Sequence, residues 1–485
     1  MAKQDFTETY ELVVGLEVHA QLLTNTKLFC GDPAEFGAEP NTQVSPITLA
    51  HPGTLPRLNK KAVEYAIMMG LACDCRINRQ NYFARKNYFY PDLPKGYQIS
   101  QHTTPVCVGG LVSITTASGV RNIQLNRIHL EEDAGKSIHD VLPGHSAIDY
   151  NRAGVPLIEI VTEPDIHTAE EAYAYLTELR KRLRYLGICD GNMEKGSMRC
   201  DANISLRLKG TSTLGTKVEV KNLNSIRNVK KAIEYEAVRL AAILDAGETI
   251  VQQTRSFDAA TGTTFALRNK EEANDYRYFP DPDLSPFIVS EAELQRLKAL
   301  LPELPVQRKQ RFINQYQLPE YDAAVLCDER ETADLYEKIC AQSPNYKAAA
   351  NWMLGPVKAW LNEHNGTVAD FPVTPEKLSR LIDFTVSGKL SFSVASSKIL
   401  PALISSPGKD PVDLARELNL VQDSGDDELE DWVRIVLEKY PEKVAEYRKG
   451  KKGLLGMFMG EVKKLSRGKA DPRRTTTILE KKLQS

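Results

Sequence analysis

Two short segments of this 485-residue chain concentrate acids and a histidine at spacings that suit metal and phosphate chemistry. In RIHLEEDAGK, Arg127, His129 and Glu131 occupy alternate positions, so in a strand they share one face. In PLIEIV, Glu159 stands between two isoleucines, as a carboxylate inside an otherwise apolar strand. A buried carboxylate without a partner is costly, so Glu159 needs a cation, a metal ion or a proton beside it. A structural ion pair would satisfy one such acid, but several acids with a histidine favour a metal-and-phosphate site.

A third segment, ELVVGLEVHAQLL, alternates between apolar and polar residues and predicts a strand. Glu17 and His19 share its polar face, where they could bind a metal or simply meet solvent.

The segment RKNYFYPDLPKGYQISQ, residues 85–101, mixes cations, aromatic residues and prolines in a predicted loop. Aromatic rings can stack on a base while cations hold phosphate, and Lys86 is the cation that we expect to do so. The alternative is a surface loop that packs its aromatic rings on the core.

Two later segments, MRCDANISLR and TKVEVKN, also place polar side chains on one face and apolar ones on the other. The polar faces comprise Arg199, Asp201, Asn203, Ser205 and Arg207 in the first, and Lys217, Glu219 and Lys221 in the second. Such a face is usually the wet side of an antiparallel sheet. Because it recurs beside the central acids, we favour a curved antiparallel sheet whose polar face lines a cavity.

Helices are predicted between the strands of this sheet, and the later part of the chain is predicted to be helical. Thr168 and Ser225 begin apolar repeats at helical spacing, which end at Gly187 and Gly247. From about Ser290 onward, helical spacing takes over. We therefore predict an α+β protein with a large antiparallel-sheet cradle and flanking helices, followed by an all-α helical domain and a small helical tail domain. The predicted domains are residues 1–292, 293–410 and 411–485.

The C-terminal end is basic, and from Arg448 onward lysines and arginines far outnumber acids. The segment KGKKGLLGMFMGEVKKLSRGKADPRR favours a small helical module that grips an RNA backbone, although a charge run is more often a solvated surface. The residues that we expect to contact RNA are Lys463, Lys464, Arg467 and Lys469.

Composition narrows the class of protein. The net charge is only −2, so any nucleic-acid contact must come from a local patch. No apolar run approaches the roughly 18 residues of a membrane helix, and the first residues lack the apolar core of a signal peptide. We expect a cytoplasmic protein without membrane contact. The eight cysteines are scattered without a C-x-x-C pair, which predicts neither structural zinc nor disulfides.

Two familiar motifs are missing from the sequence. It contains no G-x-x-x-x-G-K-[ST] loop, so phosphate binding must use the sheet face and its loops. It also shows no nucleophile signature of an amidase.

Seven segments, in order along nearly the whole chain, resemble the B-subunit family of the glutamyl/aspartyl-tRNA amidotransferases. They are YELVVGLEVHAQL, RKNYFYPDLPKGYQISQ, HLEEDAGKS, NRAGVPLIEIVTEPD, RCDANISLR, KNLNS and DYRYFPDPD. The resemblance implies that the chain binds ATP and Mg²⁺ and phosphorylates the side-chain carboxylate of misacylated Glu-tRNA(Gln), Asp-tRNA(Asn) or both. It also implies a heterotrimer, in which a glutaminase (amidase-type) A subunit supplies ammonia through a tunnel and a small C subunit joins the two.

The resemblance assigns roles to individual residues. The family's metal-site positions match Glu17, His19, Glu131 and Glu159, whereas Glu132 matches an outer or second-metal position. We expect catalysis to involve Glu131, Glu159, Lys86 and Glu132, and ATP to contact Lys86, Arg199, Asp201, Asn203 and Lys221. Because histidine is an unusual ligand of Mg²⁺, Mn²⁺ is an alternative. Some members bind zinc through cysteines after the first strand, but only Cys30 stands there, so no zinc is expected.

Two other functions fit part of the pattern. A stand-alone ATP-dependent carboxylate–amine ligase would not need the basic C-terminal module, so deletion from residue 411 onward would leave its activity intact. A non-catalytic tRNA-binding scaffold would tolerate Glu131→Gln and Glu159→Gln.

Overall fold

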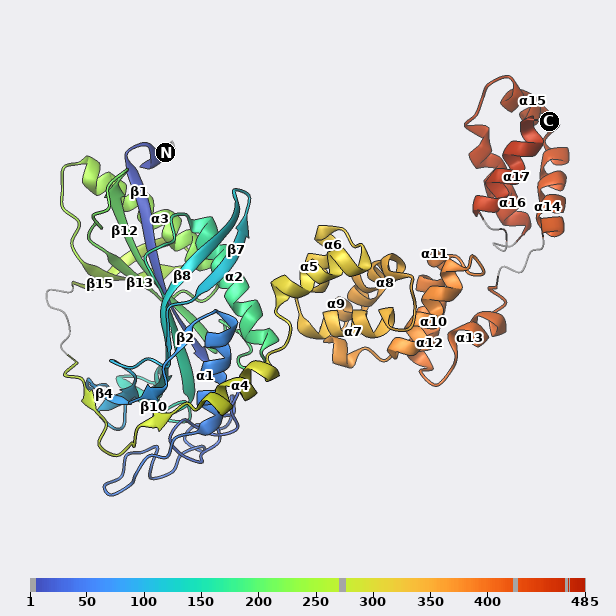
Figure 1. The fold of residues 1–485 in the computed structure, drawn as a ribbon. Coiled ribbons are helices and arrows are strands. Elements are labelled where there is room, and N and C mark those ends of the chain that lie inside the picture. Colours follow the sequence, from blue (N-terminus) through green and yellow to red (C-terminus); the bar gives the residue numbers. More distant parts are fainter. Residues whose placement is uncertain (1–5, 270–275, 422–425, 467–469, 471, 485) are drawn as a thin grey trace. The chain divides into compact units, whose positions relative to one another are not determined.

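A large sheet organises the first part of the chain in the computed structural model (Figure 1). The structure describes all residues except 1–5, 270–275, 422–425, 467–469, 471 and 485. The chain divides into two compact units at Pro305, and the described residues lie in one or the other.

Within the described part of the first unit, the large sheet has ten strands in the order β15-β14-β13-β12-β1-β11-β8-β6-β2, with β7 paired to β8. Its strands are β1 (Tyr10–Gln21), β2 (Arg76–Ile77), β6 (Cys107–Val108), β7 (Leu111–Thr116), β8 (Gly119–Glu132), β11 (Pro156–Thr162), β12 (Met198–Leu208), β13 (Val218–Lys221), β14 (Gln253–Asp258) and β15 (Thr263–Asn269). Smaller sheets pair β3 (Gln80–Asn81) with β17 (Phe287–Ile288), β4 (Ala84–Asn87) with β5 (Tyr97–Ser100) and β16 (Phe279–Pro280), and β9 (Lys136–Leu142) with β10 (His145–Asp149).

The helices of the first unit are η1 (Phe6–Glu8), α1 (Lys60–Ala72), α2 (Ala169–Tyr185), α3 (Ile226–Asp245) and α4 (Glu291–Leu300). The two helices predicted from their caps are confirmed, because Thr168 and Ser225 accept hydrogen bonds from the first turns of α2 and α3. Gly187 and Gly247 follow these helices with φ values of +66° and +75°, a left-handed conformation that glycine adopts without strain.

The α+β class is confirmed, but the sheet is mixed rather than wholly antiparallel. Strands β13 and β14 are parallel neighbours, whereas the other paired strands of this sheet are antiparallel. Helix α3 lies between β13 and β14 in the chain and returns it to the same end of the sheet, which a parallel pair requires.

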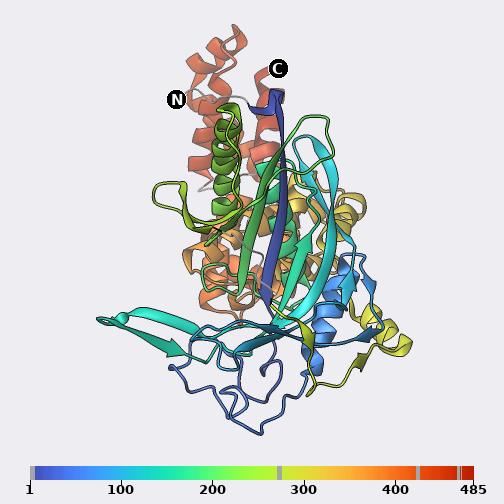
Figure 2. The same cartoon turned by 90° about the vertical axis from the view of Figure 1, so that its left-hand side faces the viewer.

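The two faces of the sheet differ as the alternation predicts. On β1, Leu12, Val14, Leu16 and Val18 are buried in a core that also includes apolar side chains of α1, α2 and α3. The opposite face of β1 and β12 is turned toward the viewer in Figure 2, and it carries the polar residues described below.

The second unit is helical throughout its described residues. Its helices are α5 (Pro305–Tyr316), α6 (Glu320–Leu326), α7 (Arg330–Cys340), α8 (Tyr346–Trp352), η2 (Met353–Val357), α9 (Lys358–Glu363), η3 (Val368–Asp370), α10 (Pro375–Val386), α11 (Phe392–Val394), η4 (Ala395–Ile399), α12 (Leu400–Ser405), α13 (Pro411–Glu417), α14 (Asp426–Lys439), α15 (Pro441–Arg448), α16 (Leu454–Leu465) and α17 (Pro472–Gln484).

Two separate hydrophobic cores lie within this unit. One runs from Phe312 to Ala415 and the other from Val433 to Leu483. The domain boundaries at 292 and 410 stay predictions. None of the helices in the described part of the chain is long and apolar enough to cross a membrane.

Candidate active site

The polar face of the sheet carries a row of ionisable side chains across four adjacent strands, β8, β11, β1 and β12. Residues directly opposite one another in the strand registers form the row His129, Glu159, His19 and Arg199. Cross-strand neighbours on one face lie close enough for their side chains to interact. The sheet register therefore brings together residues that are far apart in the sequence.

Two of the predicted metal-site residues, His19 and Glu159, stand in this row, and a third, Glu131, follows His129 by two residues on β8 and joins them. The Nε2 atom of His19 lies 3.4 Å from Oε2 of Glu159. The Nε2 atom of His129 lies 3.6 Å from the same oxygen and 3.3 Å from Oε1 of Glu131. One potential ligand atom from each of His19, Glu131 and Glu159 lies within 4.8 Å of the other two. We call these three residues the acid–imidazole cluster.

The strands β4 and β5 hold the carboxylate of Glu131. The hydroxyl of Ser100 donates a hydrogen bond of 2.6 Å to its Oε1 atom, and the amide of Gln98 donates one of 3.1 Å to its Oε2 atom. The ammonium of Lys86 lies 4.0 Å from Oε1. Glu131 is therefore oriented by neutral donors and lies beside the ammonium of Lys86, whose role near a phosphate stays a prediction.

Nearby histidines and Lys86 offset burial and the mutual repulsion of the two carboxylates of the cluster. Burial raises the pKa of Glu159, but His129 and His19 outweigh burial and hold that pKa below its usual range. Burial and the charge of Glu159 raise the pKa of Glu131, yet His129 and Lys86 bring it below its usual value. Burial lowers the pKa of His19 and the contact with Glu159 raises it, with a net upward shift. The carboxylates therefore stay ionised near neutral pH, as ligands of a cation must be, whereas His19 must release the proton that its raised pKa favours before it can bind one.

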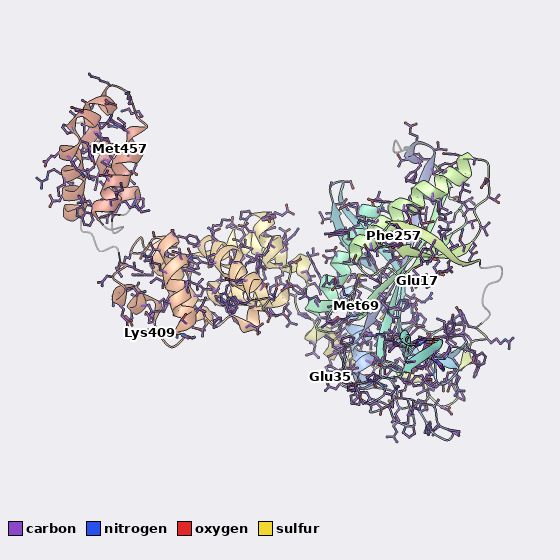
Figure 3. All side chains as sticks on the ribbon, turned by 180° about the vertical axis from the view of Figure 1, so that it is seen from behind. Glu17, Glu35, Met69, Phe257, Lys409 and Met457 are labelled. Atoms are coloured by element: carbon purple, nitrogen blue, oxygen red, sulfur yellow. The ribbon has the colours of Figure 1, made fainter. Side chains whose placement is uncertain are left out.

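Glu17 belongs to a second cluster on the same face of β1, and Figure 3 labels it. Its carboxylate lies within 4.8 Å of ligand atoms of Asp201 and Glu219. The ammonium of Lys221 lies 2.5 Å from Asp201 and 3.0 Å from Glu219. Asn203 donates a hydrogen bond of 2.9 Å to Glu17. Three of the predicted ATP contacts thus surround Glu17, whereas the structure does not bring Glu17 into the acid–imidazole cluster.

Glu132 alternates to the opposite face of β8 from Glu131. Its carboxylate forms an ion pair with Lys95 and accepts a hydrogen bond of 2.9 Å from the backbone of Ile99. It is only 3% exposed and lines a small cavity with Lys27 and Lys95. The structure therefore separates Glu132 from the acid–imidazole cluster.

Two residues to which the prediction assigned no metal, catalytic or ATP role belong to this region. His129 touches both carboxylates of the cluster, and its Nδ1 atom is buried without a hydrogen-bond partner among the described residues. Asp133 accepts hydrogen bonds of 2.8 Å from Arg199 and 2.7 Å from Gln21. Alternation in the sequence already predicts His129 on the same face as Glu131, but the family's motif assigns it no role.

The donor set of the cluster suits a divalent cation. Two carboxylates and one imidazole within 4.8 Å of one another can bind a single ion. The carboxylates fit Mg²⁺, and the imidazole also fits Mn²⁺.

The predicted RNA contacts lie on α16 and just beyond it. Lys463 and Lys464 are exposed, and Lys464 lies 3.0 Å from Glu461. Arg467 and Lys469 lie outside the described residues.

The fold and this site define an α+β protein with an acid–imidazole site on the polar face of a mixed, largely antiparallel sheet, followed by helices. Residues 12–295 match the family described as the GatB/GatE catalytic domain, and residues 334–483 match the GatB domain. The chain belongs to this family, as the resemblance of its seven segments predicts.

Relatives of similar length share about half of its residues. The B subunit of an aspartyl/glutamyl-tRNA(Asn/Gln) amidotransferase from Chlorobium phaeobacteroides (strain BS1) is 51% identical over 475 residues, which cover 98% of this chain and 99% of the relative. The protein of the same name from Geobacter sp. (strain M21) is 50% identical over 478 residues, with the same coverage.

Proposed function

We propose that this chain activates the side-chain carboxylate of misacylated Glu-tRNA(Gln), Asp-tRNA(Asn) or both by ATP-dependent phosphorylation, and then directs its amidation by ammonia. The relatives are named for an aspartyl/glutamyl-tRNA(Asn/Gln) amidotransferase. The observation that carries the proposal is the convergence of His19, Glu131 and Glu159 beside the ammonium of Lys86.

The chemistry explains why these residue types are needed. A carboxylate is a poor electrophile, so one of its oxygens first attacks the γ-phosphorus of ATP and ADP leaves. Ammonia then attacks the acyl carbon. Inorganic phosphate departs with that carboxylate oxygen, and the amide is left on the tRNA-bound amino acid. Phosphoryl transfer depends on positioning and on neutralising negative charge.

Each residue of the site has its own proposed role in phosphoryl transfer. Lys86 would hold an oxygen of the transferred phosphoryl group, and the hydrogen bonds from Ser100 and Gln98 would keep the Glu131 carboxylate oriented. His19, Glu131 and Glu159 would hold Mg²⁺ or Mn²⁺, which supplies charge neutralisation at the phosphate oxygens. We propose that the nucleotide extends from this cluster toward Arg199, Asp201, Asn203 and Lys221 on the same face of the sheet.

The proposal includes partners. Ammonia would come from a glutaminase (amidase-type) A subunit, with a small C subunit completing a heterotrimer. The basic helix α16, with Lys463 and Lys464 exposed, would contact the tRNA backbone.

Ammonium-supported amidation tests the assignment of the chemistry. The co-expressed complex is given misacylated Glu-tRNA, ATP and ammonium chloride in place of glutamine, so that the glutaminase is bypassed. We expect ATP-dependent Gln-tRNA formation, and a loss of at least about two orders of magnitude in kcat for Glu131→Gln.

The matched control is Glu11→Gln, an acid on the same strand as His19 that pairs with Arg207 and not with the cluster. It should retain wild-type kcat. Wild-type activity of Glu131→Gln would instead make this chain a non-catalytic tRNA-binding scaffold.

A further inference from the structure

Aromatic rings from two distant segments of the chain meet beside Lys86. Strand β16 pairs with β4, and the backbone of Asn87 donates a hydrogen bond of 2.9 Å to the carbonyl of Tyr276. The rings of Tyr88 and Tyr276 touch edge to face, with their centroids 6.2 Å apart. The ammonium of Lys86 lies 5.1 Å from the centroid of the Tyr276 ring. Strand pairing therefore adds an aromatic residue from the end of the first unit to the segment that holds Lys86.

These rings continue outward to the surface. The ring centroid of Tyr90 lies 6.4 Å from that of Tyr88, and Tyr90 is 62% exposed. Phe89, between them in the chain, is 88% exposed, more than any other large hydrophobic side chain of the described residues. The segment therefore does not pack all of its rings on the core. We call Tyr90, Tyr88 and Tyr276 the aromatic track, because they lead from solvent to Lys86 and the acid–imidazole cluster.

The exposed part of this segment suits unpaired nucleotides. Every base has a flat face on which an aromatic ring can stack, and such stacking removes apolar surface from water. The hydroxyls of Tyr88 and Tyr276 form no hydrogen bond with a described residue, so they can bond to a ribose or to an aminoacyl group. At its inner end the track meets a cation, Lys86, which lies 4.0 Å from Glu131.

The aromatic track also lies on the side of the cluster from which the acceptor must arrive. In phosphoryl transfer, the attacking and leaving oxygens are roughly in line, on opposite sides of the phosphorus. The proposed ATP contacts extend from the cluster to β12 and β13. Lys86 instead contacts Glu131 on β8, at the other end of the row that runs from β8 through β11 and β1 to β12. The acceptor carboxylate would therefore approach from the β8 side.

We infer that the 3′ end of the tRNA enters along the aromatic track. Phe89 and Tyr90 stack on its unpaired nucleotides, and Tyr88 and Tyr276 flank its aminoacylated terminal nucleoside beside Lys86. The inference rests on the proposed function and names the part of this chain that receives the tRNA substrate. The rings carry no charge, so their removal should weaken tRNA binding without changing its salt dependence, unlike the neutralisation of α16.

Equilibrium binding of tRNA to the purified complex tests this inference without measuring activity. The probes are tRNA(Gln) and the same tRNA shortened by its unpaired 3′ nucleotides, and the variant is Phe89→Ala with Tyr90→Ala. The double variant should bind intact tRNA about tenfold or more weakly than wild type. It should bind the shortened tRNA within about twofold of wild type, because two changes that remove the same contact are not additive. Phe89→Tyr with Tyr90→Phe keeps both rings and should bind intact tRNA as wild type does.

The matched control is Phe36→Ala, which removes another ring of the first unit that is 71% exposed. It should bind both forms of tRNA as wild type does. Unchanged binding in the double alanine variant, or equal weakening for intact and shortened tRNA, would overturn the inference. Loss of the other subunits from that variant would also overturn it, since the rings would then face a partner protein. A complex that needs the rings to bind the 3′ end, yet forms no Gln-tRNA from ATP and ammonium chloride, would support the inference and refute the proposed function.

Discussion

The carboxylate of Glu159 is buried between two imidazoles that come from neighbouring strands, His19 and His129. A buried charge is tolerated only when it is paired, and here the partners are groups that can also bind cations or hold protons. This distinguishes the acid–imidazole cluster from purely structural ion pairs elsewhere in the chain. The cluster differs from those ion pairs in the types of residue that surround the carboxylate, not in how deeply the carboxylate is buried.

The ion pair between Arg308 and Glu337 is a purely structural one, and it can be compared with the acid–imidazole cluster. The side chain of Arg308 is 7% exposed and contacts Glu337 and Asp334, and Arg311 lies 2.6 Å from Glu337. Burial raises the pKa of Glu337, but Arg311 and Arg308 outweigh burial and lower it. A lowered folded-state pKa means that this stabilisation is present above the unfolded-state value and is lost as the pH falls through the folded value.

We expect Glu337→Gln to destabilise the second unit by about 1–3 kcal/mol at pH 7, because Arg308 loses a charged partner. The difference from wild type should shrink as the pH falls below the unfolded-state pKa of about 4.3. All three tryptophans, Trp352, Trp360 and Trp432, belong to this unit, so urea unfolding followed by tryptophan fluorescence measures it selectively.

The control for this variant is Glu320→Gln. Glu320 is 74% exposed and pairs with Lys309 at the surface, so its loss should cost at most about 1 kcal/mol. An equal effect of both variants, or an effect of Glu337→Gln that is constant with pH, would contradict the account of this ion pair.

At the scale of elements, alternation along strands predicts which residues share a face, and the structure agrees. Alternation does not reveal which strands are neighbours, so the row that joins His129, Glu159, His19 and Arg199 depends on a register that only the structure supplies. The parallel pairing of β13 and β14 is missed for the same reason.

The separation of Glu17 from His19 has a geometric cause. Residues two apart in a strand share a face but stand about 7 Å from each other, so each joins its own cross-strand neighbours. Glu17 therefore joins Asp201 and Glu219, whereas His19 joins Glu131 and Glu159. Glu132, adjacent to Glu131, turns to the other face for the related reason that the period of a strand is two. The family's motifs predict which residue types stand at these positions, but they do not predict which residues lie beside them on neighbouring strands.

At the scale of the whole molecule, the chain combines a candidate catalytic sheet with a basic C-terminal helical region. Because the net charge is only −2, the tRNA binding that we propose would depend on local patches, and the affinity should fall steeply as salt rises. Lys464 is partly neutralised by Glu461, which leaves Lys463 as the stronger candidate of the two.

Neutralising Lys463 and Lys464 together should reduce the slope of log binding constant against log salt by about one to two. The measurement is equilibrium binding of misacylated tRNA to the complex between about 50 and 200 mM salt. The matched double variant, Lys358→Gln with Lys398→Gln, changes two exposed lysines outside α16 and should keep the slope. An unchanged slope in the α16 variant would remove this helix from the interface.

The central claim is that the side-chain carboxylate is activated by phosphorylation, and the fate of its oxygen tests this most directly. Glu-tRNA carrying ¹⁸O in the side-chain carboxylate is incubated with the complex, ATP and ammonium chloride, and the inorganic phosphate is analysed by mass spectrometry. The account predicts one ¹⁸O atom in each phosphate released, because the phosphate departs with a carboxylate oxygen. Phosphate without the label, formed in step with Gln-tRNA, would contradict it.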